Sequence, residues 1–126
     1  MIRHLSATGI TSAGYVQLHP NVGYRWKILS VQLFLKTGSA SGSRQVAINY
    51  SPYQTLAGDA ILLCGIGSQT GTDSDYFTNL FGSSGGTYIK YSDIYCDAST
   101  NITTVPSLQT GDSYGYDIQV LEEPDI

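Results

Sequence analysis

The fold is decided by residues 33–50, LFLKTGSASGSRQVAINY, in which two apolar runs flank a tract of small residues. Apolar side chains recur at every second position in both runs, which is the period of a β-strand with one buried face. No helix follows the small-residue tract and no lysine serves it, which excludes a phosphate-binding loop. The need of both runs for a common core also argues against a free linker. We therefore predict a hairpin-like turn in which Gly38 and Gly42 permit a positive φ.

Arg44 begins the second of these strands, residues 44–50, and we expect its guanidinium to pair with a carboxylate from a loop. The first strand extends back to residue 25, and its apolar series changes phase between Ile28 and Leu29, which predicts either a bulge or a strand that is buried on both sides at its entry. On this prediction Leu29 shares a face with Leu33. Further strands are predicted at residues 15–20, 60–67, 75–82, 87–96 and 113–124, and residues 105–112 are predicted as a loop or turn.

The strand pattern predicts an all-β chain, because no window of about eleven residues shows a helical stripe. We expect an antiparallel two-sheet β-sandwich, jelly-roll-like, with about seven or eight strands and little or no helix. An immunoglobulin-like sandwich fits the same number of strands. That fold places its tryptophan between two cysteines, however, whereas Trp26 precedes both Cys64 and Cys96.

The length of 126 residues suits one domain with a single core. Charged residues make up only 13% of the chain, while Gly and Tyr number 14 and 10, a composition typical of sheets and turns. With 41% hydrophobic residues, the chain is apolar enough to fold. We expect an N-terminal arm over residues 1–14, rich in Ser, Thr and Gly, and a single β-sandwich domain over residues 15–126.

The net charge of −4 and the scatter of the basic residues argue against a nucleic-acid partner. The six basic residues are Arg3, Arg25, Lys27, Lys36, Arg44 and Lys90. No apolar run approaches the roughly 20 residues of a membrane span, so no membrane contact is expected. The first 15 residues, MIRHLSATGITSAGY, also lack the apolar stretch of a secretory signal.

Both cysteines lie in apolar stretches, with no second Cys or His at metal-ligand spacing. This excludes a zinc site at Cys64 and Cys96. It favours two reduced core thiols over a disulfide, since two cysteines without a secretion signal make a weak disulfide framework.

Three short patterns imitate functional motifs. Residues 82–86, GSSGG, match the nucleophile motif G-x-S-x-G around Ser84, but no helix follows, so we predict a loop. Residues 65–71, GIGSQTG, are glycine-rich after a strand, yet they lack a phosphate-binding lysine and read as a turn. Asp73 and Asp75 alternate as in a calcium loop, but the glycine and glutamate of an EF-hand are missing, which favours a surface turn over a weak cation site.

No catalytic, cofactor-binding or metal-ligating residue is predicted, and we expect the protein not to be an enzyme and to hold no cofactor. His4 and His19 lie near the N-terminus, away from any serine or cysteine nucleophile. The carboxylates that a glycosidase would need lie in or beside turns and at the end of the last strand, which suggests solvation and edge protection. They are Asp93, Asp97, Asp112, Asp117, Glu122 and Glu123.

Tyrosine is the most suggestive feature of the composition, since its ring supplies contact area and its hydroxyl a polar tip. Tyr88, Tyr91 and Tyr95 crowd one segment. Three interpretations remain open: ordinary sandwich core, a subunit interface, or a platform on which a sugar stacks.

Two segments resemble small structural proteins of tailed-bacteriophage virions. Residues 19–52, HPNVGYRWKILSVQLFLKTGSASGSRQVAINYSP, are similar to the opening of such proteins: a Pro/Gly turn, a strand with an aromatic and a long apolar run, a small-residue turn, and an arginine entering the next strand. Residues 105–123, VPSLQTGDSYGYDIQVLEE, are similar to their close, in which a Leu and a Gly-Asp turn lead into an acidic final strand.

The resemblance implies a jelly-roll-like sandwich that decorates a capsid or builds a minor part of the particle. It implies a virion location, after synthesis in the host cytoplasm, with the major capsid protein or other virion proteins as partners and a symmetric homo-oligomer as the binding form. Two alternatives remain: a tail or head–tail connector component of the same particle, and a carbohydrate-binding β-sandwich module that uses exposed tyrosines.

Overall fold

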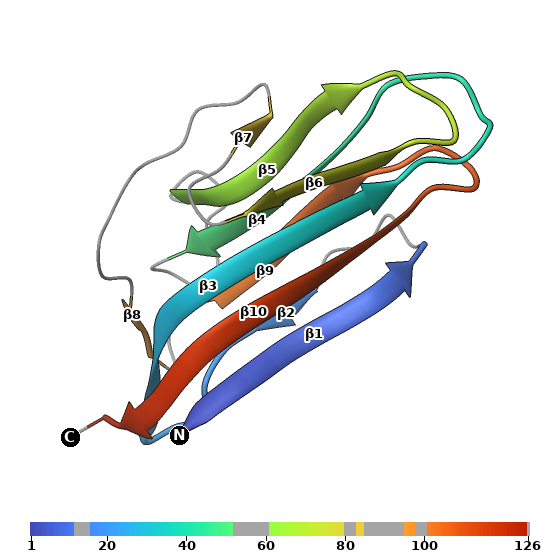
Figure 1. The fold of residues 1–126 in the computed structure, drawn as a ribbon. Helices are drawn as coiled ribbons and strands as arrows, with labels where there is room; N and C mark the ends of the chain where they lie inside the picture. Colours follow the sequence, from blue (N-terminus) through green and yellow to red (C-terminus); the bar gives the residue numbers. More distant parts are fainter. Residues whose placement is uncertain (12–15, 52–60, 80–82, 85–94, 98–100, 126) are drawn as a thin grey trace.

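A computed structural model describes residues 1–11, 16–51, 61–79, 83–84, 95–97 and 101–125. These residues form ten strands and no helix (Figure 1). The strands are β1 (Ile2–Ile10), β2 (Gln17–Leu18), β3 (Tyr24–Lys36), β4 (Arg44–Ser51), β5 (Ile61–Gln69), β6 (Asp75–Asn79), β7 (Ser83–Ser84), β8 (Tyr95–Cys96), β9 (Asn101–Ser107) and β10 (Ser113–Pro124).

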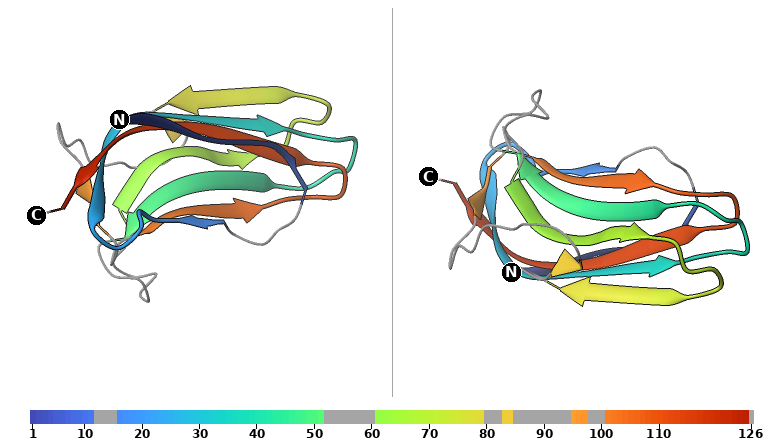
Figure 2. Two further views of the ribbon diagram at one scale, coloured as in Figure 1. Left: turned by 90° about the horizontal axis from the view of Figure 1, so that it is seen from below. Right: turned by 90° about the horizontal axis from the view of Figure 1, so that it is seen from above.

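The strands form two sheets that pack face to face (Figures 1 and 2). Sheet A has the order β1-β10-β3-β6, with β8 also pairing with β3, and sheet B has the order β2-β9-β4-β5-β7. All these pairs are antiparallel except that of β5 with the two-residue β7. Consecutive strands along the chain always belong to different sheets, except β4 and β5, which are neighbours in sheet B. This is the winding of a jelly roll, and the predicted fold class is confirmed.

The hairpin predicted at residues 37–43 is wrong, because β3 and β4 belong to different sheets. Their apolar faces meet across the core, and the segment between them is a crossover at one end of the sandwich. A period of two shows that each strand buries one face. The same period results whether the two strands are neighbours in one sheet or pack against each other from opposite sheets. Of the two glycines expected to have a positive φ, only Gly42 does, at 125°.

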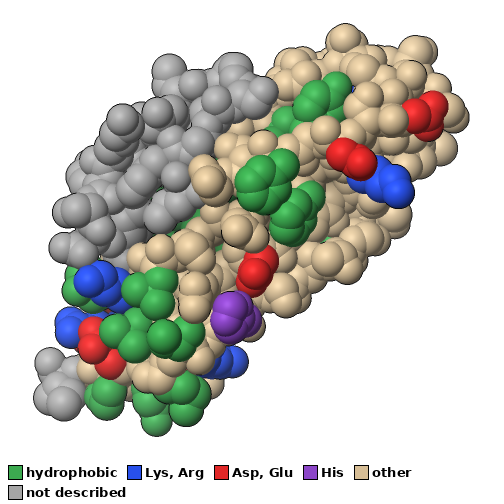
Figure 3. All heavy atoms as spheres, viewed as in Figure 1, with side chains coloured by type: hydrophobic (Ala, Val, Ile, Leu, Met, Phe, Trp, Pro, Cys, Tyr) green, Lys and Arg blue, Asp and Glu red, His purple; other side chains and the backbone are tan. Residues whose placement is uncertain are grey.

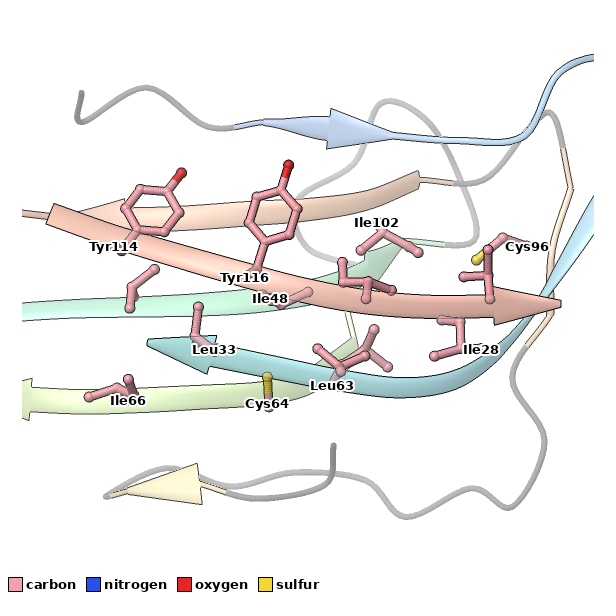
Figure 4. Packing of buried hydrophobic residues seen from close by; sticks show 14 of the residues in the cluster. Ile28, Leu33, Ile48, Leu63, Cys64, Ile66, Cys96, Ile102, Tyr114 and Tyr116 are labelled. Atoms are coloured by element: carbon pink, nitrogen blue, oxygen red, sulfur yellow. The ribbon is translucent and has the colours of Figure 1, made fainter. Parts of the chain in front are cut away.

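The core lies between the sheets, and inward-pointing side chains of β3, β4, β5 and β10, with Ile102 of β9 and Cys96 of β8, fill it (Figure 4). In β10 the predicted series is buried without exception; its members are Tyr114, Tyr116, Ile118 and Val120. Tyr114 satisfies its hydroxyl inside the core, with its oxygen 2.9 Å from Oγ1 of Thr104 on β9. A buried tyrosine of this kind fills volume without leaving an unpaired polar group.

The predicted bulge in β3 is confirmed. The register with β10 shifts between Gln119 and Val120, and this shift allows Ile28 and Val31 to point into the core although three positions separate them. Leu29 lies at the bulge and is 39% exposed, so its predicted place on the buried face was wrong. The phase change predicted an extra residue but did not show which side chain would be expelled.

Residues 1–14 were expected to form an arm outside the sandwich, but the structure places Ile2–Ile10 as β1 at one edge of sheet A. β1 pairs regularly with β10 from Ile2 to Ala7 and then bulges, with Gly9 at a φ of 66°. Gly115 on β10 makes room for this bulge, because a Cβ there would lie 2.7 Å from the Ala7 carbonyl oxygen. The alternation in β1 is weak, since only Leu5 and Ala7 pack against the core before the bulge.

The loop predicted at residues 105–112 is partly a strand, because β9 runs to Ser107 and includes Pro106. Thr104 donates its N–H to the carbonyl of Val16, on the side of β9 that faces β2. Backbone nitrogens two residues apart point to the same side of a strand, so the nitrogen of Pro106 also faces that side. The pairing with β2 covers only Ile102 and Thr103, and no donor is needed at residue 106. Of the strand predicted at residues 87–96, only Tyr95–Cys96 lies within the described residues.

Candidate functional site

A buried ion pair with several hydrogen bonds lies at one end of the sandwich. Arg44 at the start of β4 and Asp112 just before β10 both have fully buried side chains. Nε of Arg44 lies 3.0 Å from Oδ2 of Asp112, and Nη2 lies 3.1 Å from Oδ1. This fork-to-fork geometry is the strongest way in which an arginine holds a carboxylate.

The remaining donors of Arg44 bind backbone carbonyls. Nη2 donates to Ala40 at 2.6 Å, and Nη1 donates to Gly42 at 2.9 Å and to Gly71 at 3.4 Å. Asp112 in turn accepts the backbone N–H groups of Gly38 and Gln109, both at 2.8 Å. Both charges therefore have the hydrogen bonds that a buried ion needs.

The ion pair joins three described crossovers at this end of the molecule, residues 37–43, 70–74 and 108–112. The first two also share backbone bonds: Thr37 donates its N–H to the Ser74 carbonyl at 2.8 Å, and Asp73 donates to Gly38 at 2.9 Å. The first and third are in close contact, since a Cβ on Gly38 would lie 2.9 Å from the backbone of Gly111. One arginine thus fixes how the two sheets close at this end.

The environment keeps both groups charged. Burial alone would raise the pKa of Asp112, but the hydrogen bond from Arg44 and those from the amides of Gly38 and Gln109 outweigh it and lower the pKa to about 2. The same hydrogen bond raises the pKa of Arg44. A carboxylate that neither releases nor takes up a proton near neutral pH is suited to a structural role rather than to acid–base chemistry.

The structure therefore confirms the prediction that Arg44 pairs with a loop carboxylate. It corrects the interpretation of Asp112 as a solvated turn residue, because this carboxylate is buried. The sequence did carry one signal for Asp112, the Gly-Asp turn before the final strand. Gly111 adopts a φ of 89°, which a glycine tolerates, and this turn brings Asp112 beneath the crossovers.

A second polar cluster lies at the opposite end of β10. Oε1 of Glu122 accepts the indole N–H of Trp26 at 3.1 Å and a guanidinium N–H of Arg3 at 3.0 Å. The bond from Trp26, with help from Arg3, lowers the pKa of Glu122. The backbones of Met1 and Glu122 exchange two further bonds. This cluster holds the start of β1 against β10, so Glu122 does more than protect a sheet edge.

Tyr95 is the one member of the predicted tyrosine group that lies in the described part of the chain, and it is 42% exposed. The guanidinium of Arg25 lies 5.2 Å from the centre of its ring, and Nε of Arg25 binds Glu123 at 2.9 Å. Arginine already stacks on one face of this ring, which argues against Tyr95 as a sugar platform. Tyr88 and Tyr91 lie outside the described residues.

The motif-like patterns show strands and turns. Ser83–Ser84 form β7 rather than a loop, while residues 82, 85 and 86 lie outside the described residues. Gly65–Gln69 belong to β5, so the predicted turn accounts only for the end of that pattern. Asp73 lies in a turn, at a φ of 48°, and Asp75 begins β6. Across the described ranges, no three His, Cys, Asp or Glu side chains gather as a metal site requires.

The two histidines and the other carboxylates of this group that the structure describes lie at the surface. Nδ1 of His4 lies 3.5 Å from Oδ1 of Asp117 in an exposed pair, and Nδ1 of His19 lies 2.9 Å from the carbonyl oxygen of Pro20. Asp97 is exposed, and Asp93 lies outside the described residues.

Cys64 and Cys96 are both buried thiols that form no disulfide, which confirms the prediction of two reduced core thiols. Burial raises the pKa of Cys64 to about 12, so this thiol is held as an inert apolar side chain.

No protein-family model matches the chain, and neither a curated protein nor a solved structure matches it. Within the described ranges, no helix is long and apolar enough to cross a membrane.

Proposed function

We propose that the protein is a non-enzymatic structural component of a tailed-bacteriophage particle, most simply a decoration or auxiliary protein of the capsid. The observation that carries the proposal is the jelly-roll strand order, which occurs in viral capsid proteins as well as in lectins and cupins. Together with the resemblance of residues 19–52 and 105–123 to virion proteins, it favours the viral member of this group.

The two resembling segments are linked physically. Arg44 comes from the first and Asp112 from the second, and their ion pair closes the sandwich. This supports the proposal, because the features shared with virion proteins are those that hold this fold together.

The surface of the sandwich supports a role in binding rather than in catalysis. Figure 3 shows the outer face of sheet A, where apolar side chains gather over β3 and β6 and again near the two termini. Phe34 and Phe77 form the first group, with ring centroids 5.5 Å apart, and Phe77 is 57% exposed. Exposed aromatics on a rigid sheet are the residue type on which protein interfaces most depend.

The proposal is tested by mass spectrometry of purified particles from cells that make the protein. A decoration protein is expected at a copy number comparable with that of the major shell protein, because it follows the symmetry of the shell. A copy number limited to one small ring would point to a tail or connector component instead. Absence from the particles would contradict both assignments, and binding to a glycan array would then favour the carbohydrate-binding alternative.

A further inference from the structure

The four edges of the sandwich are unequal. Within the described residues, three of them end in short strands: β6 has five residues, and β2 and β7 have two each. The fourth edge is β1, with nine residues, and within the described part of the chain no strand lies on its outer side (Figure 1). Short edge strands are a common protection against pairing with another chain, and β1 lacks it.

Backbone hydrogen bonds show which groups β1 presents outward. Met1 and Glu122 exchange both of their backbone bonds, so Arg3, Leu5 and Ala7 also bond to β10. The N–H and C=O groups of Ile2, His4 and Ser6 therefore point to the free side. The register with β10 is regular from Ile2 to Ala7, and this segment contains no proline, so neither a bulge nor a missing donor interrupts this part of the edge.

Apolar surface accompanies the free edge. Leu5 and Ala7 on β1 are only partly buried against the core, as are Val16 and Leu18 at the neighbouring edge of sheet B. Figures 1 and 2 place β1 and β2 along the same side of the sandwich. A strand added to β1 would cover part of this surface as well as satisfy the backbone.

We propose that the regular part of β1, residues 2–7, pairs with β1 of a second copy of this chain, in antiparallel orientation about a two-fold axis at His4. Two identical strands suit this edge, because equal lengths and equal patterns match every outward donor with an acceptor. In this register His4 faces His4 of the second copy, and Ile2 faces Ser6. The bulge after Ala7 ends the pairing, and sheet A continues from one copy into the other.

Crosslinking tests the register with a matched pair of variants. Facing residues that share both hydrogen bonds have Cα atoms about 5.5 Å apart, within the range of a disulfide. His4→Cys is therefore expected to give a covalent dimer under mild oxidation. Ser6 is exposed on the same strand, but the Cα atoms of the two Ser6 residues would lie roughly 13 Å apart. Ser6→Cys is therefore expected to stay monomeric in denaturing gels. The native thiols are buried and do not compete.

Paired charges give a second test that does not need a crosslink. Ile2→Glu/Ser6→Lys and Ile2→Lys/Ser6→Glu place opposite charges across the axis, whereas Ile2→Lys/Ser6→Lys and Ile2→Glu/Ser6→Glu place like charges there. Sedimentation equilibrium is expected to show dimers that are about tenfold weaker for the like-charged variants, since two cross-strand pairs change sign.

A native chain that stays monomeric at millimolar concentration, or equal crosslinking of His4→Cys and Ser6→Cys, would overturn the inference. The inference goes beyond the proposed function and does not depend on it. A monomer found on particles would contradict the β1 pairing and support the virion role. A dimer that is absent from particles would support the pairing and contradict the virion role.

Discussion

Arg44 and Asp112 show how a buried charge organises the protein at the scale of single residues. Taking two charges out of water is costly, and their attraction offsets that cost only when the geometry is good and the other hydrogen bonds are made. Here the carbonyls of Ala40 and Gly42 and the amide of Gly38 make those bonds. The desolvation cost offsets much of the attraction, so the pair contributes little net stability. Removing one partner is nevertheless costly, because the other charge then stays buried without a counter-charge.

Asp112→Asn is therefore expected to lower the free energy of unfolding by about 3–5 kcal/mol, because it leaves the Arg44 guanidinium buried without a counter-charge. Urea denaturation measures the change. Asp117→Asn, which removes a partly exposed carboxylate from the same strand region, is the control and is expected to change stability by about 0.5 kcal/mol or less. Equal effects of the two substitutions would contradict the role of the ion pair.

Stability is also expected to fall in acid. The pKa of Asp112 is about 2 in the folded protein and about 3.9 in an unfolded chain, so the unfolded state binds more protons between these values. The stabilisation is complete above about pH 5 and is lost as the pH falls toward 2. Glu122, whose pKa is also lowered, acts in the same direction.

Urea midpoints measured between pH 6 and pH 2 test this dependence. The native chain is expected to lose stability more steeply than Asp112→Asn, which keeps only the contribution of Glu122 and the exposed carboxylates. Parallel curves for the two proteins would show that the Asp112 pKa is not lowered by folding.

The sequence predicted one half of this site. Arg44 stood out as a lone cation between a turn and a strand, and a loop carboxylate was the expected partner. Which carboxylate could not be predicted, because Asp112 lies 68 positions away and reaches Arg44 only through the crossing of strands between sheets. Local pattern does not contain that information.

At the scale of elements, β3 is the central strand of sheet A, and its bulge separates two buried series. Leu33 is fully buried and Leu29 is 39% exposed, although an unbroken alternation would place both on one face. Leu33→Ala is expected to cost about 2–5 kcal/mol in unfolding free energy, as for other core leucines. Leu29→Ala is expected to cost about 1 kcal/mol or less. Similar losses for both in urea unfolding would place the bulge elsewhere.

β1 depends on a glycine in the neighbouring strand. Gly115→Ala places a Cβ 2.7 Å from the Ala7 carbonyl oxygen, so the bulge of β1 must move away from β10. The expected cost is roughly 1–3 kcal/mol, with faster hydrogen exchange confined to the amides of β1. Ser113→Ala, two residues earlier on the same strand, is the control. Unchanged exchange in β1 would show that the close approach is not required.

Strands that have a neighbouring strand on each side were easier to predict from the sequence than edge strands, because their apolar side chains alternate regularly. β4 and β10 alternate clearly because each lies between two other strands and covers the core along its length. The sequence predicts an arm in place of β1, because an edge strand with a bulge buries few side chains and tolerates Ser, Thr and Gly. Pro106 concealed β9 in a similar way, since its nitrogen faces the side where β2 has already ended.

At the scale of the whole molecule, the sequence predicted a two-sheet sandwich but misplaced the connection at residues 37–43. The residues of a turn indicate where the chain reverses direction. They do not indicate which of the two sheets the next strand joins, because that depends on how all the strands pack around the core. The crossover matters for the proposed role, because it joins the two sheets through Arg44 at one end and leaves the face of sheet A and the edge of β1 available for contacts.

The most direct test of the account is sedimentation of the purified chain with phage particles assembled without it. A decoration protein is expected to pellet with the particles and to saturate at a stoichiometry set by the symmetry of the shell. Asp112→Asn, if it unfolds, should lose this binding, and Asp117→Asn should retain it. A folded native chain that stays in the supernatant at saturating concentration would contradict the proposal that the protein is a structural component of the virion.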